Sequence, residues 1–202
     1  MKPFTKNELV ITVFTLLFIG TVFLFNIRIA ERRARDAQRH ADLNAVVDAL
    51  NKHFEDYGFF PPSEDGKIKA CEDEDFNSVI SELRDLKQFD HGLYFSGLRK
   101  CNWGNDGLLD LLENGQEYMK LIPGDPVSQS GAQYYYISNL KRFQIFTYLE
   151  EEWKAERFNE AIYNRNLPCG NFRCNYGRSY SETPLDISLE EYERLLFEKE
   201  TN

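Results

Sequence analysis

An uncharged apolar segment near the N-terminus constrains this chain more than any other feature of its sequence. From Leu9 to Phe25 there is no charged side chain, and no later stretch of the chain approaches this length of apolar residues. A helix needs roughly 17–25 such residues to cross the hydrocarbon core of a bilayer. We therefore expect residues 1–27 to form one transmembrane helix segment. It should be retained, because the apolar run is longer than that of a secretory signal and no small-x-small cleavage site follows it.

The same helix is predicted to continue beyond the membrane. No proline or turn cluster follows the apolar run, and residues 28–57 carry an apolar stripe at three- and four-residue spacing. This amphipathic continuation should pack one face on a soluble body. Gly58 is expected to cap the helix, and Pro61 and Pro62 prevent it from restarting. The stripe consists of Leu43, Val46, Val47, Leu50, Phe54 and Tyr57.

Residues 58–202 are long enough for one globular domain with a modest core, with a C-terminal extension from about residue 150. The expected fold class is α+β: the long helix packed on a small antiparallel β-sheet, with extra short helices. Turn residues separate two β-rich stretches, 134–138 and 143–149, as in a hairpin. Helical spacing predicts helices from residue 76 to about 89, over 108–113, and after a capping-box pattern at Ser188. Residues 150–163 have loosely helical spacing and are expected to form a helix or an ordered loop. Residues 63–74 and 92–107 are predicted as loops.

The charge is unevenly distributed. The chain has a formal net charge of −9, of which residues 1–57 contribute +1 and the remainder −10. Because a body this acidic repels phosphates, we expect no nucleic-acid partner. The arginines directly after the apolar run would be attracted to anionic headgroups at about 1 kcal/mol each. They are equally compatible with solvated or snorkelling helix positions. They are Arg28, Arg32, Arg33, Arg35 and Arg39.

All four cysteines lie beyond the apolar segment. Cys169 and Cys174 flank Gly170 in a loop, so a small closed disulfide loop is favoured, and Cys71 would then pair with Cys101. Free thiols remain an alternative. Zinc is a weaker one, because the spacing is not CxxC and the three histidines are scattered. We expect no metal site and no cofactor.

Two features disagree on orientation. Five arginines follow the apolar run and two lysines precede it, which by the positive-inside rule places the body in the cytoplasm. The cysteines favour an oxidising compartment instead. We give the cysteines more weight and expect the body outside the cytoplasm, anchored by a single pass in the inner or cytoplasmic membrane.

The sequence contains no recognisable catalytic motif, neither a nucleophile elbow, a phosphate loop, HExxH nor a dinucleotide fingerprint. His40 and His53 lie on the predicted long helix and His91 in a predicted loop. We therefore do not expect an enzyme.

Three blocks of the sequence, in this order, resemble type IV pilins and the pseudopilins of type II secretion. Residues 2–11 are similar to the prepilin-type leader junction, and residues 35–61 to the second half of the family's helix and its exit. Residues 121–126, with Pro-x-Asp-Pro, and the tyrosines at 134–136 are similar to the body of major pseudopilins. The resemblance covers about residues 2–62 and 118–149.

This resemblance implies a structural subunit that leaves the membrane and assembles through its N-terminal helix into a filament, either a type IV pilus or a secretion pseudopilus. Pro3 and Phe4 would form the prepilin peptidase junction, and Glu8 would pair with the free amine of Phe4 in a neighbouring subunit. Implied partners are other pilins, the prepilin peptidase, and the assembly ATPase and platform. An assembled subunit would lie in the pilus or at the cell surface.

The chain departs from this family at the junction. Pro3 stands where the family has glycine, and Lys6 and Asn7 are polar where it is usually apolar. Proline has a fixed φ and no N–H, so it presents a different backbone for cleavage. The alternative function is a binding module with a pilin-like fold, fixed to the outer face of the membrane by an uncleaved signal anchor.

Overall fold

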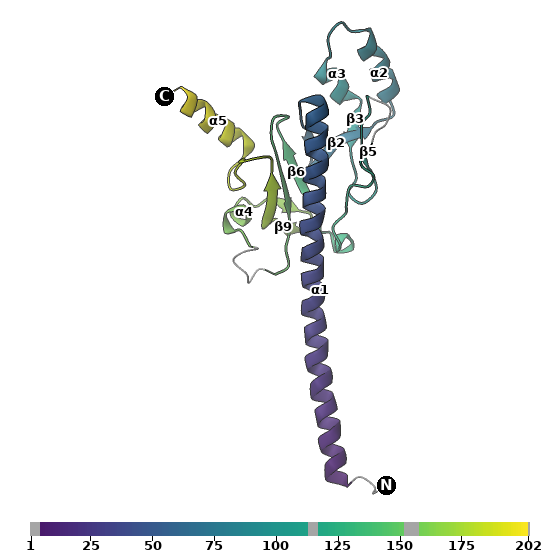
Figure 1. Cartoon of the computed structure of the whole chain (residues 1–202), viewed down its shortest axis with the longest axis vertical. Coiled ribbons are helices and arrows are strands. Elements are labelled where there is room, and N and C mark those ends of the chain that lie inside the picture. The colour runs from purple at the N-terminus through teal and green to yellow at the C-terminus, as the bar shows by residue number, and fades with distance from the viewer. Residues whose placement is uncertain (1–4, 113–116, 152–157, 202) are drawn as a thin grey trace.

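The computed structural model describes residues 5–112, 117–151 and 158–201. One helix, α1 (Lys6–Tyr57), runs along most of the length of the molecule, and the described body gathers around its C-terminal half (Figure 1). Thr5 caps the start of α1, and Gly58 ends it in the left-handed conformation, with φ of 74°. The predicted continuous helix and its glycine cap are confirmed. The chain is α+β, with this helix and small antiparallel sheets.

Only the second half of α1 contacts the body. Up to Ile29 its residues are exposed or half-buried, and the first fully buried positions are Asp36 and Arg39. Of the predicted stripe, Leu43, Val46 and Leu50 are buried, while the other three members are half-buried against the same core. We call residues 6–32 of α1 the stem and the described residues beyond 57 the body.

The main sheet of the body contains three strands in the order β10-β7-β6. The hairpin β6 (Tyr135–Ser138) and β7 (Phe143–Thr147) pairs antiparallel, as predicted, with Tyr136 opposite Ile145. On the other edge of β7 lies β10 (Tyr176–Ser179), which the sequence did not reveal. Every residue of β7 is buried, because the sheet is covered on both faces.

A second sheet replaces much of the predicted loop at residues 63–74. It consists of β1 (Ser63–Glu64), β2 (Lys67–Glu72) and β3 (Leu98–Lys100) in that order. The predicted helix over 108–113 is wrong: the described part of that segment holds β4 (Leu108–Leu109), which pairs with β5 (Glu117–Met119). A further small pair joins β8 (Pro168–Cys169) to β9 (Phe172–Arg173).

Short helices complete the body. They are α2 (Phe76–Asp85), α3 (His91–Ser96), the 3₁₀ turn η1 (Ser128–Ser130), α4 (Glu160–Asn164) and α5 (Leu189–Glu200). Helix α2 ends four residues earlier than predicted, and α3 occupies part of the predicted loop at 92–107. The predicted cap of α5 is present, since Ser188 Oγ accepts a hydrogen bond from the Glu191 amide at 3.1 Å. Helices α2 and α3 lie at the end of the molecule farthest from the N-terminus, and α5 projects sideways (Figure 1).

Candidate functional site

The stem presents an apolar surface that nothing in the body covers. Helix α1 is the one helix among the described residues that is long and apolar enough to cross a membrane, and its most apolar 18-residue window is 0% buried. Phe14, Phe18 and Phe25 are each about 70% exposed, at 72%, 71% and 68%. Such a surface must be covered by lipid or by other helices, because a soluble monomer rarely exposes so large an apolar patch.

The polar side chains within the stem do not interrupt this surface. Thr12, Thr15 and Thr21 each donate a hydroxyl hydrogen bond to the backbone carbonyl four residues earlier, at 2.8–2.9 Å, and the Asn26 amide does the same at 3.0 Å. Because the three hydroxyl protons are bonded within the helix, the threonines need no water in an apolar environment.

Glu8 lies in the first turn of α1 and caps it. The Thr5 amide donates to Glu8 Oε2 at 2.8 Å, and the Glu8 amide donates to Thr5 Oγ1 at 3.4 Å, which together form a capping box. The carboxylate is thus oriented toward the N-terminal end of the helix, where the helix dipole also favours a negative charge. The predicted junction residues Pro3 and Phe4 lie outside the described residues.

The arginines after the apolar run fall into two groups. Arg28 and Arg32 are exposed on the stem. Arg33 donates to Glu151 at 2.7 Å, and Arg35 makes a bidentate contact with Glu150 at 2.7 and 2.6 Å. The interpretation of all five arginines as headgroup-facing or solvated is therefore wrong for the last of them, Arg39, which is fully buried.

Arg39 is the centre of a buried ionic cluster at the base of the body, which we call the junction cluster: Arg39, Asp36, Asp125 and Glu150. Its guanidinium donates to both oxygens of Asp125 at 2.8 and 3.0 Å, to Asp36 at 2.8 Å and to Glu150 at 2.9 Å. Asp36 also accepts from the backbone amides of Glu150 and Glu151, each at 3.0 Å. One arginine of α1 thus joins the Pro-Gly-Asp-Pro turn to the segment that follows β7.

The electrostatics of the junction cluster favour its ionised form. Burial alone would lower the pKa of Arg39, but the hydrogen bonds and charges of Asp125, Glu150 and Asp36 outweigh it and raise that pKa. Hydrogen bonds from Arg35 and Arg39 lower the pKa of Glu150 despite its partial burial. Because the cation and its carboxylates are buried together, removing one partner would leave the other as an unpaired buried charge, which strongly destabilises the fold.

Tyrosine hydroxyls and aspartates attach α1 to the body along the rest of its length. Tyr134 of the body donates to Asp42 of α1 at 2.6 Å, and Tyr118 donates to Asp56 at 2.6 Å. In the opposite direction Tyr57 of α1 donates to Asp110 of the body. Burial is the main cause that raises the pKa of all three tyrosines, and the neighbouring carboxylate raises it further, so the hydroxyls remain donors at neutral pH. Tyr134 is itself buried, so it contributes a polar contact to α1 as well as packing.

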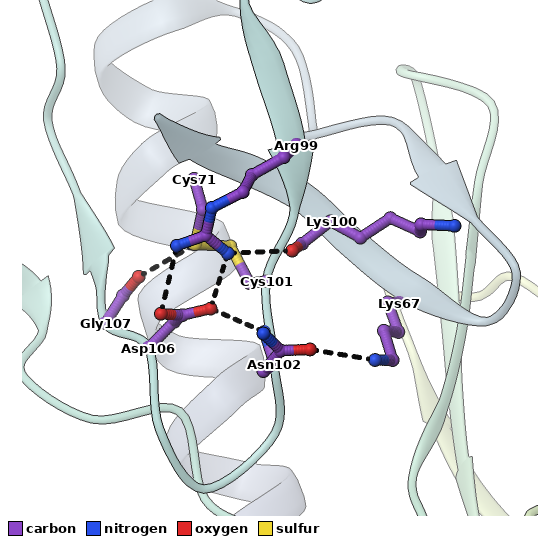
Figure 2. The surroundings of a disulfide bond; sticks show 8 residues. All are labelled: Lys67, Cys71, Arg99, Lys100, Cys101, Asn102, Asp106 and Gly107. Carbon is purple, nitrogen blue, oxygen red and sulfur yellow. Dashed lines mark hydrogen bonds and ion pairs between the residues drawn. A yellow bond between two sulfur atoms is a disulfide. The ribbon is translucent and has the colours of Figure 1, made fainter. Parts of the chain in front are cut away.

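The four cysteines form two disulfides. The structure joins Cys71 to Cys101 and Cys169 to Cys174, the pairing that the sequence favoured. The first links the end of β2 to the residue after β3, next to the Arg99–Asp106 ion pair (Figure 2). The second closes the turn between β8 and β9. Disulfides are typical of oxidising compartments.

The N-terminal helix and the disulfides indicate on which side of a membrane the body lies. The N-terminal candidate membrane helix, the one found in the described part of the chain, and the two disulfides of the body indicate a membrane-anchored protein whose body lies outside the cytoplasm. Three of the five arginines that argue for the opposite orientation are paired with carboxylates of the body.

Comparison with known proteins adds no relative. The chain matches no protein-family model, no curated protein and no solved structure.

Proposed function

We propose that this chain is a structural subunit of the pilin or pseudopilin type, which assembles through α1 into a filament of a type IV pilus or a type II secretion apparatus. The observation that carries the proposal is the division of α1 into an uncovered apolar stem and a second half held by the body. The stem surface suits both a bilayer before assembly and neighbouring stems after it.

The position of Glu8 supports the same proposal. Its carboxylate points toward the N-terminal end of the stem, and it is the one acidic residue before Glu31. If the chain is cleaved before Phe4, the new amine would need a counter-charge once it is buried among apolar helices, since an unpaired buried charge costs several kcal/mol. Glu8 of a neighbouring subunit would supply it. The prepilin peptidase and an assembly platform are the implied partners.

Glu8 has two roles that variants can separate. Glutamine retains the capping contact with the Thr5 amide but carries no charge, whereas alanine loses both. We expect Glu8→Gln and Glu8→Ala to remain in the membrane fraction and to be absent from sheared surface filaments. Glu31→Gln, which removes an exposed carboxylate from the same helix, serves as the matched control and should assemble. Assembly of Glu8→Gln would reduce the role of Glu8 to helix capping and contradict the pairing with an amine.

The alternative, a signal-anchored binding module outside the cytoplasm, is favoured by Pro3 at the junction. Mass spectrometry of the mature N-terminus distinguishes the two functions. A terminus at Phe4, with methylation, supports the filament subunit. A terminus at Met1 or Lys2 in protein that never enters filaments supports the anchored module, and Pro3→Gly should then restore cleavage if proline alone blocks it.

A further inference from the structure

The C-terminal helix α5 is attached to the body through its first half. Leu189 is buried, and the Glu193 carboxylate accepts from the Arg142 guanidinium at 3.1 Å and from the Asn139 side-chain amide at 3.3 Å. The Arg142 guanidinium also lies over the Tyr192 ring, 5.1 Å from its centroid. The tip of the β6–β7 hairpin, residues 139–142, therefore fixes the direction in which α5 projects.

The second half of α5 presents apolar side chains to solvent. Leu195 is 45% exposed and Phe197 is 68% exposed, on a segment that extends away from the rest of the body (Figure 1). Exposed apolar side chains that lie together mark interaction sites, because covering them removes apolar area from water. The helix is also acidic, since residues 189–200 carry five acidic and two basic side chains, a net charge of −3. Its partner should therefore offer apolar surface without an excess of negative charge.

A hollow of this character lies at the end of the molecule farthest from the N-terminus. Residues 86–92, at the link between α2 and α3, line it, and its volume is about 520 Å³. Leu86 is 44% exposed and Phe89 is 40% exposed. The Phe89 ring contacts the rings of His91 and Tyr94, at centroid distances of 5.0 and 5.5 Å, and is thereby held in place. An apolar surface that is already ordered loses little entropy when it binds a partner.

The charges around the hollow suit an acidic helix better than those on the other side of α2. Residues 72–75, before α2, are all acidic, but the ten residues of α2, about 15 Å of helix, separate them from the hollow. Residues 84–92 carry two basic and two acidic side chains. One of these carboxylates, Asp90, caps α3 by accepting from the Leu93 amide at 3.1 Å. An acidic helix can therefore approach the hollow, where Lys87 is exposed to receive it.

Helix α5 and the hollow cannot meet within one molecule, because they lie on opposite sides of α1 (Figure 1). Copies that are anchored in one membrane by α1 stand parallel, and in each copy both features lie near the end of α1 that is far from the stem. We propose that α5 of one copy docks, through Leu195 and Phe197, in the hollow at residues 86–92 of a neighbouring copy. Aromatic side chains that fill pockets in this way commonly carry much of the binding energy of an interface.

The two surfaces of this contact differ, so the interface is heterologous. Each docked copy keeps either a free hollow or a free α5, and the contact therefore extends into a row or ring of copies and does not close in a two-fold dimer. The contact depends on parallel anchoring and not on the proposed filament, in which it would join neighbouring bodies side by side.

Cysteine cross-linking of the full-length protein in its own membranes tests this contact. All four native cysteines are in disulfides, so a short bis-maleimide reacts with introduced cysteines. The variant Phe89→Cys/Phe197→Cys should give a ladder of dimers, trimers and higher oligomers on a reducing gel, because every copy carries both halves of the contact. Each single variant should remain monomeric. The pair Leu86→Cys/Leu195→Cys probes the same contact independently and should also give a ladder.

Leu121 provides the matched control, because it is an apolar residue of the body that is 52% exposed and lies outside the hollow. Leu121→Cys/Phe197→Cys should remain monomeric. Melting temperatures equal to that of the parent protein show that the variants are folded. The proposal is overturned if both pairs in the hollow remain monomeric, if the Leu121 variant gives the same ladder, or if Phe197→Cys alone gives dimers, which would place two α5 helices against each other.

The same experiment separates this contact from the proposed function. Native protein in sheared filaments, together with monomeric Phe89→Cys/Phe197→Cys, would refute the docking of α5 and leave the filament proposal intact. A ladder in the membranes of cells whose native protein never enters filaments would support the docking of α5 and refute the filament.

Discussion

Replacing Arg39 by methionine tests the junction cluster. Methionine fills the space of the arginine stem but removes four charged hydrogen bonds, and it leaves Asp125 buried with one backbone donor. Breaking a buried ion pair in this way typically costs about 3–5 kcal/mol. Because Asp36 keeps two backbone donors, we expect the lower end, about 3 kcal/mol.

For a chain of this size, each kcal/mol corresponds to about 2–4 °C, so Arg39→Met should lower the melting temperature by about 6–12 °C. Thermal unfolding followed by near-ultraviolet circular dichroism in detergent measures this shift. Arg32→Met, on the exposed stem, is the control and should change stability by less than about 0.5 kcal/mol.

A second substitution tests whether the stranded carboxylate of Asp125 causes this loss, because a buried charge without its partner destabilises the fold. Adding Asp125→Asn to Arg39→Met should recover part of the loss at neutral pH. If Arg39→Met matches Arg32→Met, or if the second substitution adds a further loss of the same size, the junction cluster does not hold the body to α1 as argued.

Two further predictions concern stability. Burial lowers the pKa of His53 to about 4, so the folded state favours its neutral form. The free energy of unfolding of the parent protein should therefore fall by up to about 3 kcal/mol as the pH falls from 6.5 to 4. The variant His53→Gln should lose less, as measured by chemical denaturation at both pH values. The two disulfides close loops of different size, with separations of 30 and 5 residues. Loop-closure entropy predicts that the double variant Cys71→Ala/Cys101→Ala loses about 3–4 kcal/mol and Cys169→Ala/Cys174→Ala about 2 kcal/mol, so denaturation midpoints in the reverse order would contradict the entropic account.

The features that the sequence predicted correctly are those encoded locally. The length of α1, its apolar stripe and its end at Gly58 follow from residue spacing and from one glycine before two prolines. The hairpin of β6 and β7 also lies within a single short stretch. The disulfide of Cys169 and Cys174 closes so small a loop that few other partners were available.

The errors concern contacts between distant segments. Leu108 and Leu109 form a strand because Met119 and Glu117 pair with them, and no local preference encodes that partner. In the sequence Arg39 could not be told from the four arginines before it, because the carboxylate that pairs with it, Asp125, lies 86 residues away. One signal was present and overlooked: residues 67–70 alternate between lysine and apolar residues, the period of a strand with one buried face, and they form most of β2.

Because α1 is continuous, a tilt of its membrane-spanning part displaces its far end. With 52 residues at 1.5 Å each, the helix is about 78 Å long, and no proline divides it between the apolar stem and the half that the body holds. About 45 Å of it follows residue 27. A tilt of about 20°, ordinary for a helix in a bilayer, would therefore displace its far end, near α2 and α3, sideways by about 15 Å. Membrane thickness and stem contacts thus determine where the end of the body that carries α2 and α3 points.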